Sequence, residues 1–448
     1  MPLPETDDLS LGLVHEGWNH LRLQRPIAAW ASWQRALRID TGNRAAAEAI
    51  EVLTSADELP LAARASYRFR SPLGDDRRTR WSETFAGRDL QDLAIAADVF
   101  EILRESDPSD SAAIFNCALC LAWQGRNREA IAAIGQSVAI DAADRPDDAV
   151  ASWMLAEVLR QGGGAEDDAD DVSYAVAYDW DESRGDALTV LSRMAILRVF
   201  PTPLDPKTGL PSEDGVRAGE WLEEEDAIAR VLAAVIVLPG RIRFSSPDLI
   251  GLQRAAGIWQ DALADLDLEP EWSSTPLPIR LMDSAVWLFR LAEEWSEDER
   301  RAEVETYFEK RWVLIPRHGL DFDGEPRSPA EIAFLIAGGD LVLTAKLAAI
   351  VQFREQLAAR TSRLALYVGY PFDRLRKRLG LPLNQPESVD PEDVSCMSFS
   401  ELESLDPQSL SDTSLADAIE SAIGFASPST MTKLQEERGR RQGDSRHE

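Results

Sequence analysis

SAAIFNCALCLAWQGRNREAIAAIGQSVAID, residues 111–141, is the stretch that decides the predicted fold. Its first part repeats apolar residues at three- and four-residue spacing, which is the period of an α-helix. Gly125 interrupts this pattern, and a second apolar stripe begins at Ala130. Small residues such as Ala118 and Ala130 allow two backbones to approach closely. The stretch therefore predicts two antiparallel helices joined at a glycine-containing turn.

The same residues resemble the tetratricopeptide repeat, a family whose 34-residue units place apolar, aromatic and small residues at fixed offsets. The matching positions here hold Ile114, Cys117, Ala118, Leu121, Ala130, Ile134, Ser137 and Ala142. Partial units also match, at Leu13, Gly17, Ala29, Trp33 and Ala36-Leu37, at Ala96, Phe100 and Leu103, and from Asp148 through Trp153, Leu155 and Val158. The resemblance implies a right-handed helical solenoid over residues 1–190, whose concave face binds peptides or partner proteins.

The resemblance also implies where a partner would bind. In this family the first helix of each hairpin lines the concave groove. Carried onto this chain, the groove positions that hold aromatic, Arg or Asn side chains are Trp18, Arg22, Phe115, Asn116, Trp123, Trp153 and Arg160. Aromatic residues and Arg are frequent anchors of protein interfaces. The alternative is that these Trp side chains pack between neighbouring helical units.

The chain after residue 190 shows no repeat period. Four prolines between Pro201 and Pro211 exclude a helix interior there. Helical periodicity resumes over residues 191–384 and predicts either degenerate helical repeats or a separate α-helical domain. One helix is expected at Trp221–Leu238, and another starts at Pro329 after a Ser328 cap. Arg241 to Ser245 is either a short strand or an extended link.

The C-terminal part is acidic. Residues 379–432 contain ten acids and neither Lys nor Arg, and Ser and Pro are frequent. We therefore expect residues 385–448 to form an acidic, largely flexible tail, in which Ser398 and Ser414 begin two short helices through capping boxes. The predicted fold class is all-α: a helical-hairpin solenoid, further packed helices and this tail.

Composition limits the partners. The 448 residues include 78 acidic and 47 basic side chains, which gives a net charge of −31. Binding to nucleic acid or to an anionic membrane surface requires a basic face, so neither is expected. Three cysteines cannot form a disulfide framework, and the first residues do not resemble a signal peptide. We expect a cytoplasmic protein whose partner is a protein or a peptide.

Several patterns resemble reactive motifs without their required spacing. His15 and His20 are five residues apart, whereas a zinc-binding helix places its two His four apart. Cys117 and Cys120 lie inside a predicted helix and are interpreted as small core residues. Gly162–Gly164 is followed by acids, which repel phosphate. The alternating acids at 179–183 and 321–325 lack the final Glu of a calcium loop and are typical of caps and turns. No catalytic, cofactor or metal residues are predicted.

Seven arginines between Arg64 and Arg88 form the main basic cluster. They are interpreted either as a solvated, salt-bridged face or as a site that the acidic tail covers. The predicted function is a non-catalytic scaffold or adaptor that binds a protein or peptide in an aromatic groove. Two alternatives stay open: a helical-toroid enzyme that cleaves carbohydrates with a carboxylate pair in a Trp-lined cleft, and a regulator that acts through the acidic tail.

Overall fold

The computed structural model describes residues 6–23, 25–55, 67–161, 173–194, 196–199, 216–225, 228–246, 248–266, 268–275, 305, 307–358 and 370–444. The chain forms two compact units. Unit 1 consists of residues 1–169 and 348–362, and unit 2 consists of residues 170–347 and 363–448. Among the described helices, none is both long enough and apolar enough to cross a bilayer.

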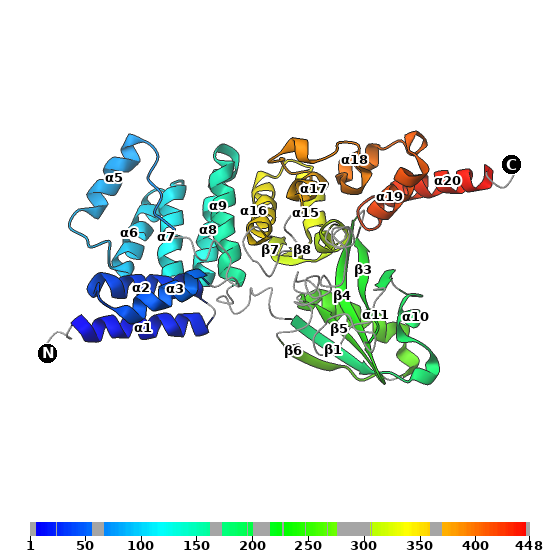
Figure 1. Cartoon of the computed structure of the whole chain (residues 1–448), viewed down its shortest axis with the longest axis horizontal. Helices are drawn as coiled ribbons and strands as arrows, with labels where there is room; N and C mark the ends of the chain where they lie inside the picture. The colour runs from blue at the N-terminus through cyan, green and yellow to red at the C-terminus, as the bar shows by residue number, and fades with distance from the viewer. Residues whose placement is uncertain are drawn as a thin grey trace. The chain divides into compact units, whose positions relative to one another are not determined.

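The described part of residues 1–161 is helical (Figure 1). Its helices are α1 (Thr6–Arg22), α2 (Pro26–Ile39), α3 (Arg44–Ser55), α5 (Asp75–Phe85), α6 (Leu93–Ser106), α7 (Ser111–Trp123), α8 (Asn127–Asp144) and α9 (Pro146–Gln161). Helices α1 and α2 pack as one antiparallel pair, and α7 and α8 pack as another. The two helices predicted within residues 111–141 are confirmed, and Gly125 lies in the turn between them with a φ of +76°.

The α1–α2 pair shows why small residues occur where helices cross. A Cβ atom added to Gly17 on α1 would lie 2.1 Å from Nε1 of Trp33 on α2. Trp33 is fully buried, and its Nε1 donates a hydrogen bond of 3.2 Å to the carbonyl oxygen of Val14. Only glycine permits this close contact. The hydrogen bond removes the cost of burying the indole N–H.

The described chain is mostly helical, as predicted, but unit 2 contains an antiparallel sheet, so the fold is not purely all-α. Its six strands are β1 (Ser173–Asp179), β2 (Ile196–Val199), β3 (Ala218–Glu225), β4 (Ile228–Leu238), β5 (Arg241–Ser246) and β6 (Glu271–Thr275). They are arranged in the order β2-β3-β4-β5-β1-β6. Strands β3 and β4 occupy the range predicted as one helix, Trp221–Leu238. The short strand considered for residues 241–245 is confirmed as β5.

The physical reason for this error lies in β4. Nine consecutive residues of β4, Ile228 to Ile236, are buried. A strand covered on both faces shows no alternation of apolar and polar residues, so its pattern resembles that of a buried helix. The β-branched residues Val231, Val235, Ile236 and Val237 were the remaining indication of a strand.

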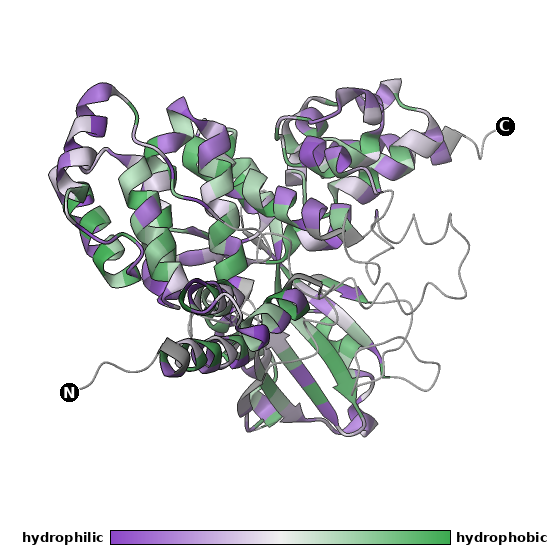
Figure 2. Ribbon diagram, turned by 60° about the vertical axis from the view of Figure 1, so that its left-hand side comes forward, coloured by the Kyte–Doolittle hydropathy of each residue, from purple (hydrophilic) through white to green (hydrophobic). Residues whose placement is uncertain are grey.

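One face of the sheet carries the hydrophobic core of unit 2. Val176 and Tyr178 of β1 and Phe244 of β5 pack against Leu252 and Trp259 of helix α11 (Leu249–Ala262). The rings of Phe244 and Trp259 lie 5.4 Å apart, centroid to centroid. Figure 2 shows hydrophobic colour along the central strands. The short helix α10 (Ala187–Leu191) contributes to the same core.

The next described elements follow the sheet in the chain. They are a π-helical turn (Tyr307–Arg311), the hairpin β7 (Arg317–Phe322) and β8 (Glu325–Arg327), and helices α15 (Pro329–Ile336), α16 (Leu341–Ala358) and α17 (Phe372–Arg378). The predicted start of α15 is confirmed, because Ser328 and Glu331 form a complete capping box. The calcium-like pattern at 321–325 is the hairpin turn, in which Asp323 and Gly324 both have positive φ.

The expectation of a largely flexible C-terminal tail is wrong for the described residues. Helices α18 (Phe399–Ser404), α19 (Asp412–Ala422) and α20 (Pro428–Asp444) follow α17. Leu415 and Ile419 of α19 are buried in a small core with Leu434 of α20. The capping box at Ser398 is confirmed, whereas α19 is capped by Ser411 and not by Ser414.

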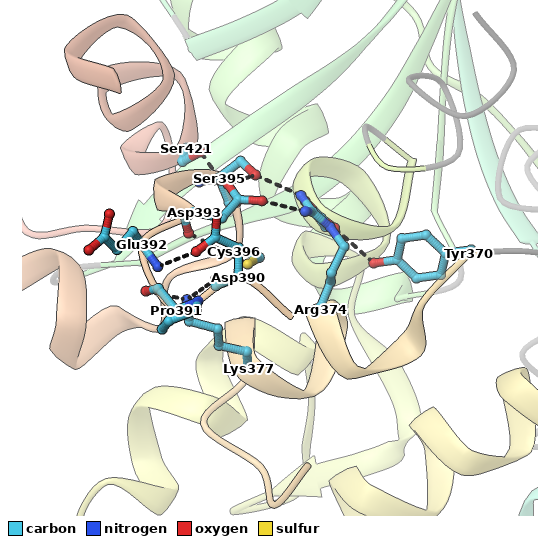
Figure 3. Close-up of polar contacts among 11 residues, drawn as sticks. Tyr370, Arg374, Lys377, Asp390, Pro391, Glu392, Asp393, Ser395, Cys396 and Ser421 are labelled. Atoms are coloured by element: carbon cyan, nitrogen blue, oxygen red, sulfur yellow. Dashed lines mark hydrogen bonds and ion pairs between the residues drawn. The ribbon is translucent and has the colours of Figure 1, made fainter. Parts of the chain in front are cut away.

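A buried arginine network fixes this segment to α17 (Figure 3). Arg374 donates to Glu309 (Nε to Oε1, 2.7 Å) and to Ser395 (Nη2 to Oγ, 2.7 Å), and it also pairs with Asp393. Arg378, fully buried, donates to the carbonyl oxygens of Met397 and Ser421. These contacts hold the C-terminal segment in place, although its acidic composition predicts a flexible tail.

Three features noted in the sequence lie outside the described residues. They are the proline-rich stretch at 201–211, the glycines at 162–164 and the first arginine of the basic cluster, Arg64.

Candidate functional site

Helix α7 carries three of the predicted groove residues, Phe115, Asn116 and Trp123. A segment of the same chain, residues 67–73, lies against them; we call this segment the strap. The strap contains no helix or strand and runs directly into α5. Pro72 and Gly74 near its end disfavour regular structure. The predicted groove of α7 is therefore occupied by an extended piece of the chain itself.

Asn116 holds the strap through its backbone. The N–H of Arg70 donates to Oδ1 of Asn116 at 2.8 Å. Nδ2 of Asn116 donates back to the carbonyl oxygen of Arg70 at 2.9 Å. Asn116 is fully buried, so both hydrogen bonds are shielded from water. Both backbone groups of Arg70 are engaged, so these two hydrogen bonds do not depend on the side chain at that position.

The side chain of Arg70 occupies a polar and aromatic pocket. Its guanidinium carbon lies 3.8 Å from the ring centroid of Phe115, in a cation–π contact. Nη2 donates to the carbonyl oxygen of Asp148, in the first turn of α9, at 2.9 Å. Nη1 lies 3.4 Å from Oδ2 of Asp141 on α8. Helices α7, α8 and α9 thus each contact the same guanidinium.

Burial sets the electrostatics of this pocket. Burial lowers the pKa of Arg70, and the nearby Asp148 and Asp141 carboxylates partly offset this effect. Burial also raises the pKa of Asp141, although a Ser111 hydrogen bond and the charges of Arg145 and Arg70 act in the opposite direction. The Asp141 side chain is fully buried. Its carboxylate therefore depends on cationic partners to remain charged.

Phe69 provides the aromatic part of the strap. Its ring lies 4.9 Å from that of Phe100 on α6 and 5.3 Å from that of Trp123 on α7, centroid to centroid. Phe69 still exposes 37 % of its surface. Arg68 and Ser71 of the strap are also exposed. The strap therefore lies on the surface of the helices and is not part of their core.

Helix α5 continues the strap and is tied to the end of α6. Arg77 and Arg80 of α5 both pair with Asp107, at 2.9 Å and 3.1 Å. The indole Nε1 of Trp81 donates to Oδ2 of Asp110 at 2.8 Å. Arg78 pairs with Asp75 within the helix. Four arginines of the predicted basic cluster thus have carboxylate partners within unit 1, as the salt-bridged interpretation expects: Arg70, Arg77, Arg78 and Arg80.

The predicted groove residues of α1 lie outside this cluster. Trp18 exposes 39 % of its surface and packs edge-on against Trp33, with the ring centroids 5.1 Å apart. Arg22 is exposed, and its Nη2 donates to Oδ1 of Asn19 at 2.6 Å. Within the described residues, no hydrogen bond, ion pair or ring contact joins these two side chains to the strap.

The predicted groove residues of α9 are buried. Trp153 exposes 2 % of its surface and Arg160 exposes 4 %. The Arg160 guanidinium lies 4.6 Å from the Trp153 ring centroid and donates to Glu157 at 2.8 Å. A Cβ atom on Gly135 of α8 would lie 3.9 Å from the Trp153 ring. Trp153 therefore packs between α8 and α9, as the alternative interpretation expects, and does not face an open groove.

The two cysteines of the Cys-x-x-Cys pattern lie within α7 and are buried. Burial raises the pKa of the Cys117 thiol to about 12, with a contribution from Glu101, and burial also raises the pKa of Cys120. Neither thiol is therefore activated for redox chemistry. The described residues contain no group of three or more His, Cys, Asp or Glu side chains that is arranged to hold a metal ion.

A cavity of about 490 Å³ lies at the end of β1 in unit 2. Asp179, Asp181 and Glu269 line it together with Trp180 and Arg184. Asp181 caps the following turn by accepting from the Ser183 N–H at 2.9 Å. The acidic pattern at 179–183 is therefore explained by a turn.

Sequence reasoning missed the residues that fill the α7 groove. Phe69 and Arg70 lie 46 residues or more before Asn116, and no local pattern connects them to it. The one available signal was an aromatic–Arg pair in a non-helical stretch of the basic cluster.

Comparisons with protein-family models, with curated proteins and with solved structures find no match for this chain.

Proposed function

We propose that this protein is a non-catalytic interaction scaffold that binds an extended segment of a protein partner on the α7 face of unit 1. The observation that carries the proposal is the pair of hydrogen bonds between Asn116 and the backbone of Arg70. A side chain that satisfies both backbone groups of one residue is suited to any extended peptide.

Two further features support the proposal. The α1–α2 and α7–α8 pairs are helical hairpins, the unit that the resemblance to tetratricopeptide repeats implies, and Gly17 lies where α1 meets α2. Phe115 and Trp123 present aromatic surface beside the clamp, and such side chains often anchor interfaces. We propose that the helices of unit 1 belong to this repeat type.

A selection experiment tests this function. The full chain is immobilised, once as wild type and once with Phe69→Ala and Arg70→Ala, and a random library of linear peptides is selected against each. We expect at least the strap-weakened form to retain peptides. Asn116→Ala should abolish their binding, because the backbone clamp is lost.

Asn43→Ala is the matched control. Asn43 is a buried Asn of the same unit, at the α2–α3 turn, where its side chain bonds Ser10 and the Ala46 N–H. Circular dichroism verifies that each variant is folded. Failure to retain any peptide, or selected peptides that bind equally well to Asn116→Ala, would contradict the proposed function.

A further inference from the structure

We infer that the strap is an internal copy of the partner's binding motif, and that the partner presents an extended segment in which an aromatic residue directly precedes an arginine. This inference rests on the proposed function, because it names the ligand class of the same groove. The strap sequence at the clamp is Phe69-Arg70, and an external segment must displace it in order to bind.

The pose of the strap is that of a bound peptide. Its anchors are the backbone clamp of Asn116, the stack of Arg70 on Phe115 and the contact of Phe69 with Trp123. Arg68 and Ser71, on either side of the anchored pair, are exposed. Binding through two adjacent residues with exposed neighbours is what a short linear motif requires.

The pocket favours arginine over other residues at the second position. The guanidinium carbon of Arg70 lies 3.8 Å from the Phe115 ring centroid, while the same group donates to the Asp148 carbonyl and the Asp141 carboxylate. The ammonium of lysine is a compact charge and does not reproduce this combination of stacking and forked donation. A neutral side chain would leave Asp141 buried with one fewer cationic partner.

Covalent attachment explains why the strap remains in place in the isolated chain. A segment attached to its own binding site has an effective concentration in the range of about 1 mM. An external peptide of equal intrinsic affinity must compete with that concentration, so its apparent affinity is reduced by the fraction of molecules with an open groove. Removing the strap's two anchoring side chains should weaken this competition, because only the backbone hydrogen bonds to Asn116 then hold the strap.

The test uses the full chain and a fluorescent peptide, Tyr-Arg-Phe-Arg-Ser-Pro-Leu, which corresponds to residues 67–73. Fluorescence anisotropy measures its binding to wild type, to Phe69→Ala with Arg70→Ala, and to Arg68→Ala. Arg68→Ala is the matched control, because it removes one arginine from an exposed position of the same strap. We expect the double variant to bind at least about tenfold more tightly than wild type, and the control to behave as wild type.

Peptide variants test the recognition itself. Replacing the second arginine of the peptide, the one that corresponds to Arg70, with lysine or alanine should weaken binding to the double variant by about tenfold or more. The same loss is expected when Asn116→Ala is added to the double variant. Circular dichroism verifies that this triple variant is folded.

The outcomes separate this inference from the proposed function. If the double variant retains library peptides through Asn116 but not the strap peptide, the function stands and the inference is overturned. Equal binding of the strap peptide to wild type and to the double variant would overturn the inference that the strap competes with an external peptide. A wild-type dimer in sedimentation that dissociates with the double substitution would overturn it as well, because the strap would then come from a second copy.

Discussion

At the scale of single residues, the buried amide of Asn116 explains why the strap packs on α7. Asn116 lies on a helix face that is otherwise apolar and fully buried. An unpaired amide in that position would cost about 1–3 kcal/mol. Its two hydrogen bonds to the strap remove that cost. The strap therefore supplies the hydrogen-bond partners of the Asn116 amide, and Asn116 in turn holds the strap in position.

Gly17 and Gly12 should respond in opposite ways to the same substitution. Gly17→Ala would place a Cβ atom 2.1 Å from Nε1 of Trp33, which is fully buried. We expect a loss of about 1–3 kcal/mol in the free energy of unfolding, because the α1–α2 pair must separate. On the same helix, Gly12→Ala meets nothing within 4 Å. There the higher helix propensity of alanine should add up to about 1 kcal/mol. Chemical denaturation of both variants measures the difference, and equal effects would contradict the predicted crossing.

At the scale of elements, the helical hairpins were predictable and the sheet was not. The period of residues 111–141 predicts α7 and α8 because apolar residues recur there at helical spacing. Strand β4 is buried by elements that are distant in the chain, so its own sequence contains no alternation. The C-terminal helices were missed for a related reason. Their order depends on Arg374 and Arg378, whose partners lie outside the acidic segment or in its turns.

The arginine network predicts which side chain holds the C-terminal helices in place. Arg374→Met removes the guanidinium that pairs with Glu309, whose side chain is 3 % exposed. A buried carboxylate that loses its cation costs about 3–5 kcal/mol. We expect faster hydrogen exchange and faster proteolysis within residues 390–444.

Lys377→Met is the matched control for this network. Lys377 lies on the same helix and donates to the carbonyl oxygens of Asp390 and Pro391 at an exposed position. Its loss should change the free energy of unfolding by less than about 1 kcal/mol. Equal protection of residues 390–444 in wild type and Arg374→Met would show that the small apolar core around Leu415 suffices without the network.

At the scale of the whole molecule, the sequence predicts the residues on one side of a long-range contact but not the segment that packs against them. The groove positions on α7 were predicted, and three of them contact the strap. Their occupant was not predicted, because the pairing depends on how the chain returns after α3. The same limit applies to charge. A net charge of −31 describes the chain as a whole, and it does not show that buried acids such as Asp141 and Glu220 are paired with arginine.

Glu220 should make unit 2 sensitive to acid within a defined pH range. Its carboxylate accepts from Arg198 (Nε, 2.8 Å) and from Arg311 (Nη2, 2.9 Å) in the interior. Burial raises the pKa of Glu220, but the two arginines outweigh burial and lower it from 4.5 to about 2. Because the folded pKa lies below the unfolded one, this carboxylate stabilises the fold above pH 4.5. The contribution is lost as the pH falls from 4.5 towards 2.

Chemical denaturation across that range, followed by tryptophan fluorescence, measures the effect. We expect wild type to lose on the order of 3 kcal/mol of unfolding free energy through this group. Glu220→Gln should be less stable at neutral pH and should lose less stability on acidification. Glu271→Gln, an exposed acid of the same sheet with a side chain 71 % accessible, is the control and should follow wild type. If wild type and Glu220→Gln decline in parallel between pH 4.5 and 2, the buried triad does not account for acid sensitivity.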